Sequence, residues 1–232
     1  MTAPAATAAA AALAARGVSV RYGRHQVLSG VDFAVPAGTT TGLAGPSGCG
    51  KSTLAAVLAL LLRPHAGTVT VDGRTTPGFR YRAPRELRTR VAIVFQQPRM
   101  AVDPRLRLRD LITEPLRATG RSAGAGAALD RLADLVGLTT ELLGRFPHEV
   151  SDGQLQRACV ARALVLGPRY LVCDEMTTML DASTQALLVH AVRAYQRDSG
   201  AGVLAVSHDP VLLDRWCDEV RNWEQVAGPR RR

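Results

Sequence analysis

The sequence predicts an α/β fold: a core with a parallel sheet, a small antiparallel β-subdomain near the N-terminus, and an inserted helical subdomain. Three observations lead to this prediction. A glycine-rich loop separates a short apolar strand from an apolar helix within residues 39–62. Further apolar runs suited to buried parallel strands lie at residues 91–95 and 203–206, each followed by polar residues, and at 170–175, which ends in two acids. Residues of about 98–165 instead read as leucine- and arginine-rich helices, so a chain of 232 residues accommodates one domain with an insertion.

The N-terminal part begins with alanine-rich sequence, and we expect residues 1–16 to form a disordered tail before a folded domain at 17–227. The tail lacks the basic start and strongly apolar centre of a signal peptide. An arginine-rich tail is expected at 228–232. Strands are expected at residues 18–22, 31–35 and 68–71, the last followed by an Asp-Gly turn. Tyr22 ends the first strand, where its ring is suited either to stack on a base or to pack in the core.

The most informative segment is the loop from Gly45 to Thr53, which reads Gly-Pro-Ser-Gly-Cys-Gly-Lys-Ser-Thr. Its glycines let successive N–H groups point inward, and the following helix adds its positive end. Such a loop binds nucleotide phosphates, with Lys51 supplying a charge and Ser52 a hydroxyl for Mg²⁺. The residues expected to contact the nucleotide are Gly45, Ser47, Gly48, Cys49, Gly50, Lys51, Ser52 and Thr53.

Lys51 is the only lysine among 29 basic residues, and all the others are arginine. A planar guanidinium differs from a slim ammonium in shape and in donor geometry, so arginine cannot replace lysine inside a tight loop. The exception at this position supports the interpretation of the loop as a phosphate site.

Two later strand ends carry side chains suited to Mg²⁺ and to hydrolysis. Gln96 follows one apolar run, and its amide oxygen is suited to Mg²⁺ or to the attacking water. Asp174 and Glu175 end the next run, where Asp174 is suited to hold Mg²⁺ and Glu175 to orient or deprotonate water. His208 follows the last apolar run. Because ligands of open α/β sheets bind at the carboxyl ends of the strands, its imidazole is expected to face the γ-phosphate.

The predicted helical subdomain contains candidate helices at residues 106–116, 124–136 and 139–145. Ser151 precedes a further helical segment at 155–166 and is suited to cap it. The position is consistent with a plain helix cap and also with a second anion contact through free N–H groups.

Composition limits the possible partners. The net charge of +9 permits binding to nucleic acid or to an anionic membrane, but arginine is spread along the chain and aromatic residues make up only 4%. We therefore expect no nucleic-acid partner. The four cysteines show neither C-x-x-C pairing nor metal-ligand spacing, which favours a reducing compartment.

Taken in order, these pieces resemble the ATP-binding subunit of ABC transporters over about residues 17–220. The loop Gly45 to Thr53 resembles the Walker A motif, and residues 170–175 resemble the Walker B motif with its catalytic glutamate. Residues 150–154 resemble the signature motif, which distinguishes this family from other P-loop ATPases, and residues 178–181 resemble the D-loop.

The resemblance implies roles for individual residues. Tyr22 stands where the family has a base-stacking aromatic, Gln96 where it has the Q-loop glutamine, and His208 where it has the switch histidine. Catalytic roles fall on Glu175 and His208. The resemblance further implies that the nucleotide is contacted by Tyr22, Gln96, Ser151, Gly153, Gln154 and Asp181. The Mg²⁺ ligands that it implies are Ser52, Gln96 and Asp174.

The resemblance also implies an ABC ATPase fold that uses ATP and Mg²⁺ in a head-to-tail dimer, each nucleotide lying between one subunit's Walker A motif and the other's signature. The implied partners are a second ABC ATPase subunit, either different from or identical to this one, two transmembrane permease subunits and, indirectly, an extracytoplasmic solute-binding protein. The implied location is peripheral, on the cytoplasmic face of the plasma membrane.

Two positions depart from the family pattern. Asp152 stands where the signature has its first glycine, and a carboxylate beside a triphosphate is repulsive unless it turns away. Met176 replaces the proline that usually follows the Walker B glutamate. Since a signature serves the partner's nucleotide, we predict an asymmetric heterodimer in which the site on this chain's own Walker A motif hydrolyses ATP.

Four short runs resemble the peptide and nickel importers within this family: residues 95–98, 102–105, 114–116 and 154–157. The expected cargo is therefore a peptide or a nickel or metal chelate. The alternatives are a soluble ABC ATPase acting on nucleic acid or ribosomes, and a P-loop enzyme of another class such as a kinase, which would lack the signature and the switch histidine in this order.

Overall fold

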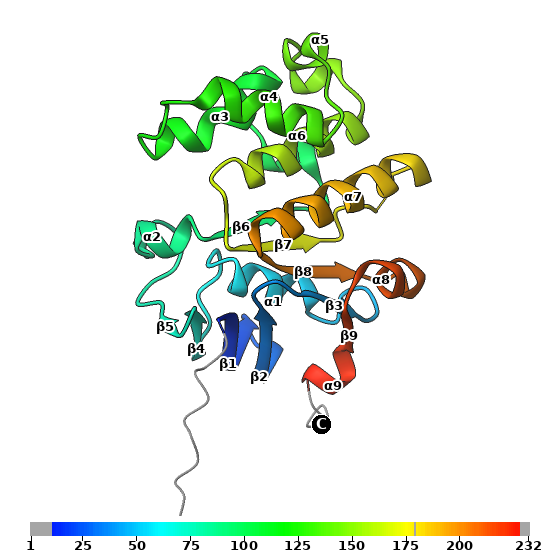
Figure 1. Ribbon diagram of the computed structural model, residues 1–232. Helices are drawn as coiled ribbons and strands as arrows, with labels where there is room; N and C mark the ends of the chain where they lie inside the picture. Colours follow the sequence, from blue (N-terminus) through cyan, green and yellow to red (C-terminus); the bar gives the residue numbers. More distant parts are fainter. Residues whose placement is uncertain (1–10, 179, 228–232) are drawn as a thin grey trace, which may run out of the picture.

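Two β-sheets organise residues 11–178 and 180–227, the part of the chain described by the computed structural model (Figure 1). One sheet is parallel, with the strand order β6-β7-β8-β3-β9, and the other is antiparallel, with the order β2-β1-β4-β5. The parallel strands are β3 (Thr40–Ala44), β6 (Val91–Val94), β7 (Tyr170–Asp174), β8 (Gly202–Ser207) and β9 (Glu219–Asn222). The antiparallel strands are β1 (Ala12–Tyr22), β2 (His25–Pro36), β4 (Ala66–Val71) and β5 (Arg74–Thr75).

The helices pack around these sheets. Their bounds are α1 (Lys51–Leu58), α2 (Arg85–Arg88), α3 (Leu108–Ala118), α4 (Ala125–Leu135), α5 (Thr140–Leu143), α6 (Asp152–Leu164), α7 (Ala182–Ser199), α8 (Pro210–Trp216) and α9 (Trp223–Ala227). Short 3₁₀ helices lie at Arg80–Arg82, Pro98–Ala101 and Pro147–Glu149. Within the described ranges, no helix combines the length and the apolar composition that crossing a bilayer requires.

The central strands separate two hydrophobic cores because their side chains alternate between the two faces of the sheet. Val172 of β7 and Leu204 of β8 belong to the core that contains α1 and the antiparallel sheet. Leu171 and Val203, one residue earlier on each strand, belong to the core that contains α3, α4, α6 and α7. All four side chains are fully buried, so the parallel sheet is covered on both faces.

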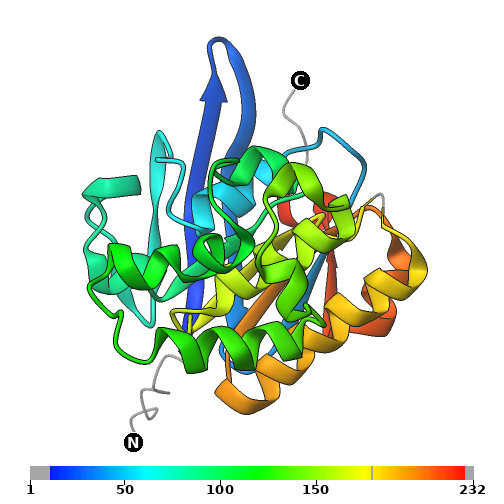
Figure 2. The ribbon, with the colours of Figure 1, turned by 90° about the horizontal axis from the view of Figure 1, so that it is seen from above.

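The regular elements between residues 98 and 165 are helical, and α3, α4 and α5 lie at the end of the molecule opposite the antiparallel sheet (Figure 1). Helix α6 lies between them and the parallel sheet, and its buried residues Leu155 and Val160 pack in the shared core. Figure 2 shows the hairpin of β1 and β2 projecting beyond the rest of the described chain.

The expectation of a disordered tail at 1–16 is wrong for residues 12–16, which form the first part of β1. Leu13 is fully buried and pairs with Val35 of β2 on one side and with Val71 of β4 on the other. Both edges of this segment are therefore hydrogen-bonded, and small alanine side chains fit against the core beneath it. Residues 1–10 and the predicted tail at 228–232 lie outside the described residues.

Candidate functional site

The carboxyl ends of β3, β7 and β8 lie level at one edge of the parallel sheet. Ala44, the last residue of β3, pairs with Ser207 of β8, and Asp174 of β7 pairs with Val206. The glycine-rich loop leaves β3 at this edge, Glu175 leaves β7, and His208 leaves β8. Register therefore brings together residues that are far apart in sequence, as predicted for ligand sites of open α/β sheets.

The glycine-rich loop is wound around the ammonium of Lys51. Lys51 Nζ donates to the carbonyl oxygens of Gly45 and Pro46 at 2.7 and 2.8 Å, and its side chain is only 3% exposed. Pro46, Ser47 and Gly48 form an exposed tip. A Cβ at Gly48 would meet no atom within 4 Å, so open space lies in front of the loop.

The side chain of Cys49 points into the protein. It is 8% exposed and its Sγ lies 4.0 Å from Lys51 Nζ. Only the backbone of Cys49 is therefore placed to contact a phosphate, together with the N–H groups at the start of α1. The assignment of residues 45–53 to nucleotide binding stays a prediction, and this geometry is compatible with it.

Ser52 and Asp174 connect the loop to β7. Ser52 Oγ donates to Asp174 Oδ1 at 3.0 Å. Burial raises the pKa of Asp174 above its ordinary value, the hydrogen bond from Ser52 lowers it, and the neighbouring charge of Glu175 raises it again. A cation between these two oxygens would favour the ionised carboxylate.

Glu175 is the point on which the other polar side chains converge. Its Oε1 lies 3.9 Å from Lys51 Nζ, and its Oε2 lies 3.5 Å from His208 Nδ1. Gln96 Nε2 donates to the same Oε2 at 3.3 Å, and the Thr178 hydroxyl lies 3.5 Å from it. The carboxylate is thus surrounded by polar groups from α1 and from the segments that follow β6, β7 and β8.

The backbone of Glu175 is in a left-handed conformation, with φ at 48°, which costs a residue with a side chain about 1–3 kcal/mol. Two hydrogen bonds hold it there: Glu175 N donates to Val206 O at 3.0 Å, and Thr178 N donates to Glu175 O at 3.1 Å. This turn directs the carboxylate back across the end of the sheet instead of along the strand.

The other predicted site residues lie elsewhere. Tyr22 is 56% exposed at the end of β1, so its ring is free to contact a base. Asp181 caps α7 by accepting from Thr184 N at 2.9 Å. Among the contacts of the described residues, none joins Tyr22 or Asp181 to the Lys51 and Glu175 cluster. Met179, within the predicted D-loop, lies outside the described residues.

The predicted signature lies at the start of α6. Ser151 caps this helix: Gln154 N donates to Ser151 Oγ at 3.2 Å, and Ser151 N donates to Gln154 Oε1 at 3.0 Å. Gly153 faces α7, since a Cβ there would lie 3.3 Å from Thr184 Cγ2. The helix-capping interpretation of Ser151 is confirmed, and a second role in anion binding stays a prediction.

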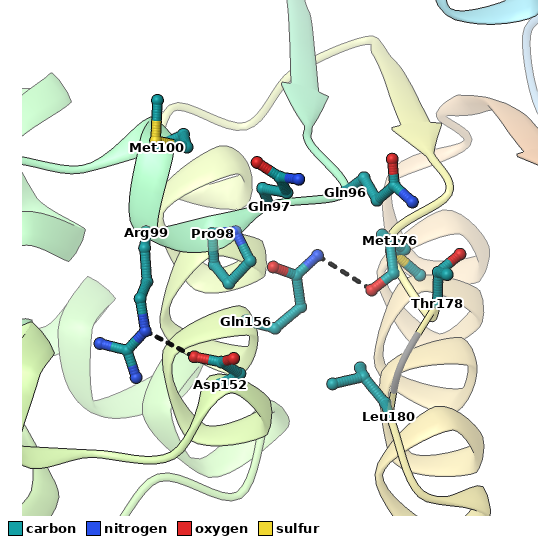
Figure 3. A pocket seen from close by; sticks show the side chains of 10 residues that line it. All are labelled: Gln96, Gln97, Pro98, Arg99, Met100, Asp152, Gln156, Met176, Thr178 and Leu180. Atoms are coloured by element: carbon teal, nitrogen blue, oxygen red, sulfur yellow. Dashed lines mark hydrogen bonds and ion pairs between the residues drawn. The ribbon is translucent and has the colours of Figure 1, made fainter. Parts of the chain in front are cut away.

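A cavity of about 350 Å³ lies between the start of α6 and the segment that follows β6 (Figure 3). Gln156 of α6 is 1% exposed and links the segments that line this cavity. Its Nε2 donates to Phe95 O, just after β6, and to Met176 O, just after β7, both at 2.9 Å. Gln96 and Thr178 line this cavity and also contact Glu175, so it adjoins the edge of the sheet.

Two contributors were missed from the sequence. Trp223 of α9 is 5% exposed and lies behind the loop: a Cβ at Gly45 would come within 2.7 Å of Trp223 Cβ. Arg99, in the 3₁₀ helix after β6, binds Asp152 at 2.7 Å. Neither residue has a local sequence signal, because each acts on a segment distant in the chain.

Comparison with known proteins places these features in context. A family model described as "ABC transporter" matches residues 28–178, more than half of the chain. The nickel import ATP-binding protein NikE of Rhodospirillum rubrum is 42% identical over 221 residues, covering 94% of this chain and 80% of that protein. The oligopeptide transport ATP-binding protein OppF of Salmonella typhimurium is 35% identical over 198 residues. That alignment covers 84% of this chain and 59% of OppF.

Solved structures show the same fold. CbiO1 of Clostridium perfringens, part of the ABC transporter complex CbiONQ, aligns with a TM-score of 0.78 at 24% identity, covering 92% of this chain and 84% of its own. The ATP-binding cassette MJ0796, in a dimeric post-hydrolysis state with ADP and Pi, aligns with a TM-score of 0.79 at 24% identity. It covers 90% of this chain and 93% of its own. The predicted fold class is therefore confirmed.

Proposed function

The chain belongs to the ABC transporter family, and from this premise we propose that it is the ATP-binding, ATP-hydrolysing subunit of an importer for peptides or for nickel or metal chelates. Family membership supports nucleotide binding and ATPase activity, and the names of the similar proteins support the type of cargo. They do not favour the alternative of a soluble ATPase acting on nucleic acid or ribosomes.

The observation that carries this proposal is the convergence on Glu175. Lys51 from the loop, Gln96 after β6 and His208 after β8 all lie within 3.9 Å of its carboxylate. A base surrounded in this way lies at the same edge as a phosphate loop, which is the arrangement that ATP hydrolysis requires.

The residues beside the loop fit Mg²⁺, which prefers oxygen ligands. The hydroxyl of Ser52 and the carboxylate of Asp174 are 3.0 Å apart, and Gln96, two residues after the end of β6, has an amide oxygen to offer. We propose that these three residues hold the ion. When bound, it would neutralise charge on the phosphate oxygens.

The remaining steps belong to side chains of this chain. Lys51 would transfer hydrogen bonds from Gly45 O and Pro46 O to the β- and γ-phosphates. Glu175 would orient the attacking water and accept its proton as the bond to the leaving ADP breaks. His208, half exposed beside Glu175, would contact the γ-phosphate, and Tyr22 would stack on the base.

The proposed assembly is a head-to-tail pair with a second ABC ATPase subunit, on the cytoplasmic face of the membrane and bound to two permease subunits. A solute-binding protein outside the membrane would deliver the cargo. Ser151, Gly153, Gln154 and Asp181 would then act toward the partner's nucleotide, and among the contacts of the described residues none joins them to Lys51 or Glu175. CbiO1 is itself part of a transporter complex, which supports this arrangement.

The test uses a tagged chain purified with its co-purifying partners from membranes of its own organism. Hydrolysis at the site on this chain's own loop should fall about 100-fold in Glu175→Gln, the range for loss of a general base, so the total MgATP hydrolysis should fall by that site's share while ATP binding is kept. Arg105→Gln is a matched control, because Arg105 is 87% exposed and, among residues 11–178 and 180–227, pairs with Asp103 alone. Unchanged hydrolysis in Glu175→Gln, or ATP-dependent capture of ribosomes or DNA in place of membrane proteins, would contradict the proposal.

A further inference from the structure

Asp152 places a negative charge at the first residue of α6, the helix end that carries the signature. Capping does not require this charge, because Ser151 and Gln154 already complete a reciprocal capping box. The carboxylate is 65% exposed and therefore available to another partner. Left alone, it would oppose any anion that approached the N–H groups of this helix.

Arg99 supplies the opposite charge from a different part of the chain. It lies in the 3₁₀ helix Pro98–Ala101, three residues after Gln96, and its Nε contacts Asp152 Oδ1 at 2.7 Å. Figure 3 shows this ion pair at the wall of the cavity between the two segments.

The guanidinium is held in place by two further bonds. Arg99 Nη1 donates to Pro147 O at 2.9 Å, and Nη2 donates to Val150 O at 3.0 Å. All three contacts are with residues 147–152, the segment that leads into α6. A planar guanidinium held by three hydrogen bonds has little freedom to move away from the carboxylate, whereas an exposed ion pair with one contact separates easily.

We propose that Arg99 is a positioning residue that neutralises Asp152 and so keeps the start of α6 competent to receive the phosphates of a nucleotide bound to the partner subunit. This inference rests on the proposed function and deepens it. It departs from the asymmetry that Asp152 alone suggested, because the signature of this chain carries a paired, not a free, carboxylate. Arg99 also ties this signature to the segment of Gln96, which contacts Glu175.

The experiment isolates the nucleotide site that this signature serves. In the membrane-purified complex, Glu175→Gln silences the site on this chain's own loop, so the residual MgATP hydrolysis reports the partner's site. In that background, Arg99→Gln should lower the residual rate about tenfold, as expected for an uncompensated charge near a phosphate. Asp152→Gly in the same background should change the residual rate less than about twofold. The double variant, Arg99→Gln with Asp152→Gly, should recover a residual rate within about threefold of the background, because the carboxylate that Arg99 neutralises is gone.

Two further variants define the outcome. Arg99→Lys keeps the positive charge without the three contacts of the guanidinium. Its residual hydrolysis rate should lie between that of the background and that of Arg99→Gln. Arg105→Gln removes a comparable exposed arginine of an ion pair and should have no effect. A double variant that stays as low as Arg99→Gln would overturn the inference, since Arg99 would then act only through the backbone of residues 147–150.

An increase of several fold in Asp152→Gly would also overturn it, because Asp152 would then be an uncompensated defect. A background without residual hydrolysis would also overturn the inference, because the partner's site, which this signature serves, would then be inactive. Failure of the proposed function is a different result: the unmutated chain would capture no ATPase or permease partner, or the captured complex would not hydrolyse MgATP.

Discussion

Substituting Gly50 by alanine tests how the phosphate loop is held from behind. Gly50 precedes α1 with φ at 122°, and a Cβ there would lie 2.8 Å from Cζ2 and 3.1 Å from Cη2 of Trp223. Trp223 is 5% exposed and Leu28, 3.2 Å from the same Cβ, is 1% exposed, so the indole has little room to move. The substitution therefore imposes both backbone strain and overpacking.

Each cost has a separate magnitude. A positive φ at a residue with a Cβ costs about 1–2 kcal/mol. Overpacking in a filled core costs about 1–3 kcal/mol. Gly50→Ala should therefore lower the free energy of unfolding by about 2–5 kcal/mol in total. Gly48→Ala is the matched control, because Gly48 has φ at 74° but open space around it. Its free energy of unfolding should fall only through backbone strain, by about 1–2 kcal/mol.

Urea unfolding without nucleotide, followed by circular dichroism, measures the difference. With an m-value of about 2 kcal/mol/M, the midpoint of Gly50→Ala should lie about 0.5–1.5 M below that of Gly48→Ala. Replacing Trp223 by leucine removes Cζ2 and Cη2 and leaves the 3.2 Å contact with Leu28, so in that background Gly50→Ala should cost at most about 1 kcal/mol more than Gly48→Ala does. Equal midpoints for the two glycine variants with Trp223 intact would refute the idea that Trp223 supports the loop.

Three further predictions follow from the same contacts. Ser52→Ala removes the hydroxyl beside Asp174 and should raise the Mg²⁺ concentration for half-maximal hydrolysis roughly tenfold; an unchanged Mg²⁺ titration would contradict this. Tyr170→Phe removes the hydroxyl that donates to Asp72 Oδ1 at 2.5 Å and should lower the free energy of unfolding by about 1.5–3 kcal/mol, measured in urea. The Ser183 hydroxyl and Thr184 N hold the pKa of Asp181 below its ordinary value. The stability from Asp181 is therefore present above about pH 4 and is lost as pH falls through the folded-state pKa. Asp181→Asn should flatten the decline of the unfolding midpoint below pH 4, and an unaltered decline would show that Asp181 does not contribute.

Features with a local cause could be predicted from the sequence. The glycine-rich loop, the apolar strands and the Ser151 cap depend on residues within a few positions of one another, so their types and spacing suffice. The edge at which Asp174, Glu175 and His208 meet was also predictable, because parallel strands align their carboxyl ends.

The N-terminal boundary could not be predicted in the same way. Residues 12–16 are mostly alanine and carry little strand preference of their own. They form a strand because β2 and β4 pair with them on both sides. The composition of residues 12–16 does not reveal that two other strands pair with them, so the disordered tail was predicted to extend too far into the chain.

The sequence by itself determined which chemical groups this protein carries: one lysine in a glycine-rich loop, two acids and a histidine at or just after the ends of buried strands, and one carboxylate within the segment that resembles the signature. Only the tertiary structure decided that this carboxylate, Asp152, forms an ion pair with Arg99. The two residues lie 53 positions apart and meet through the packing of α6 beside the end of β6. It likewise placed Trp223 behind the glycines of the loop. The physical reason is that charge compensation and steric support depend on distance in space, which spacing along the chain does not encode.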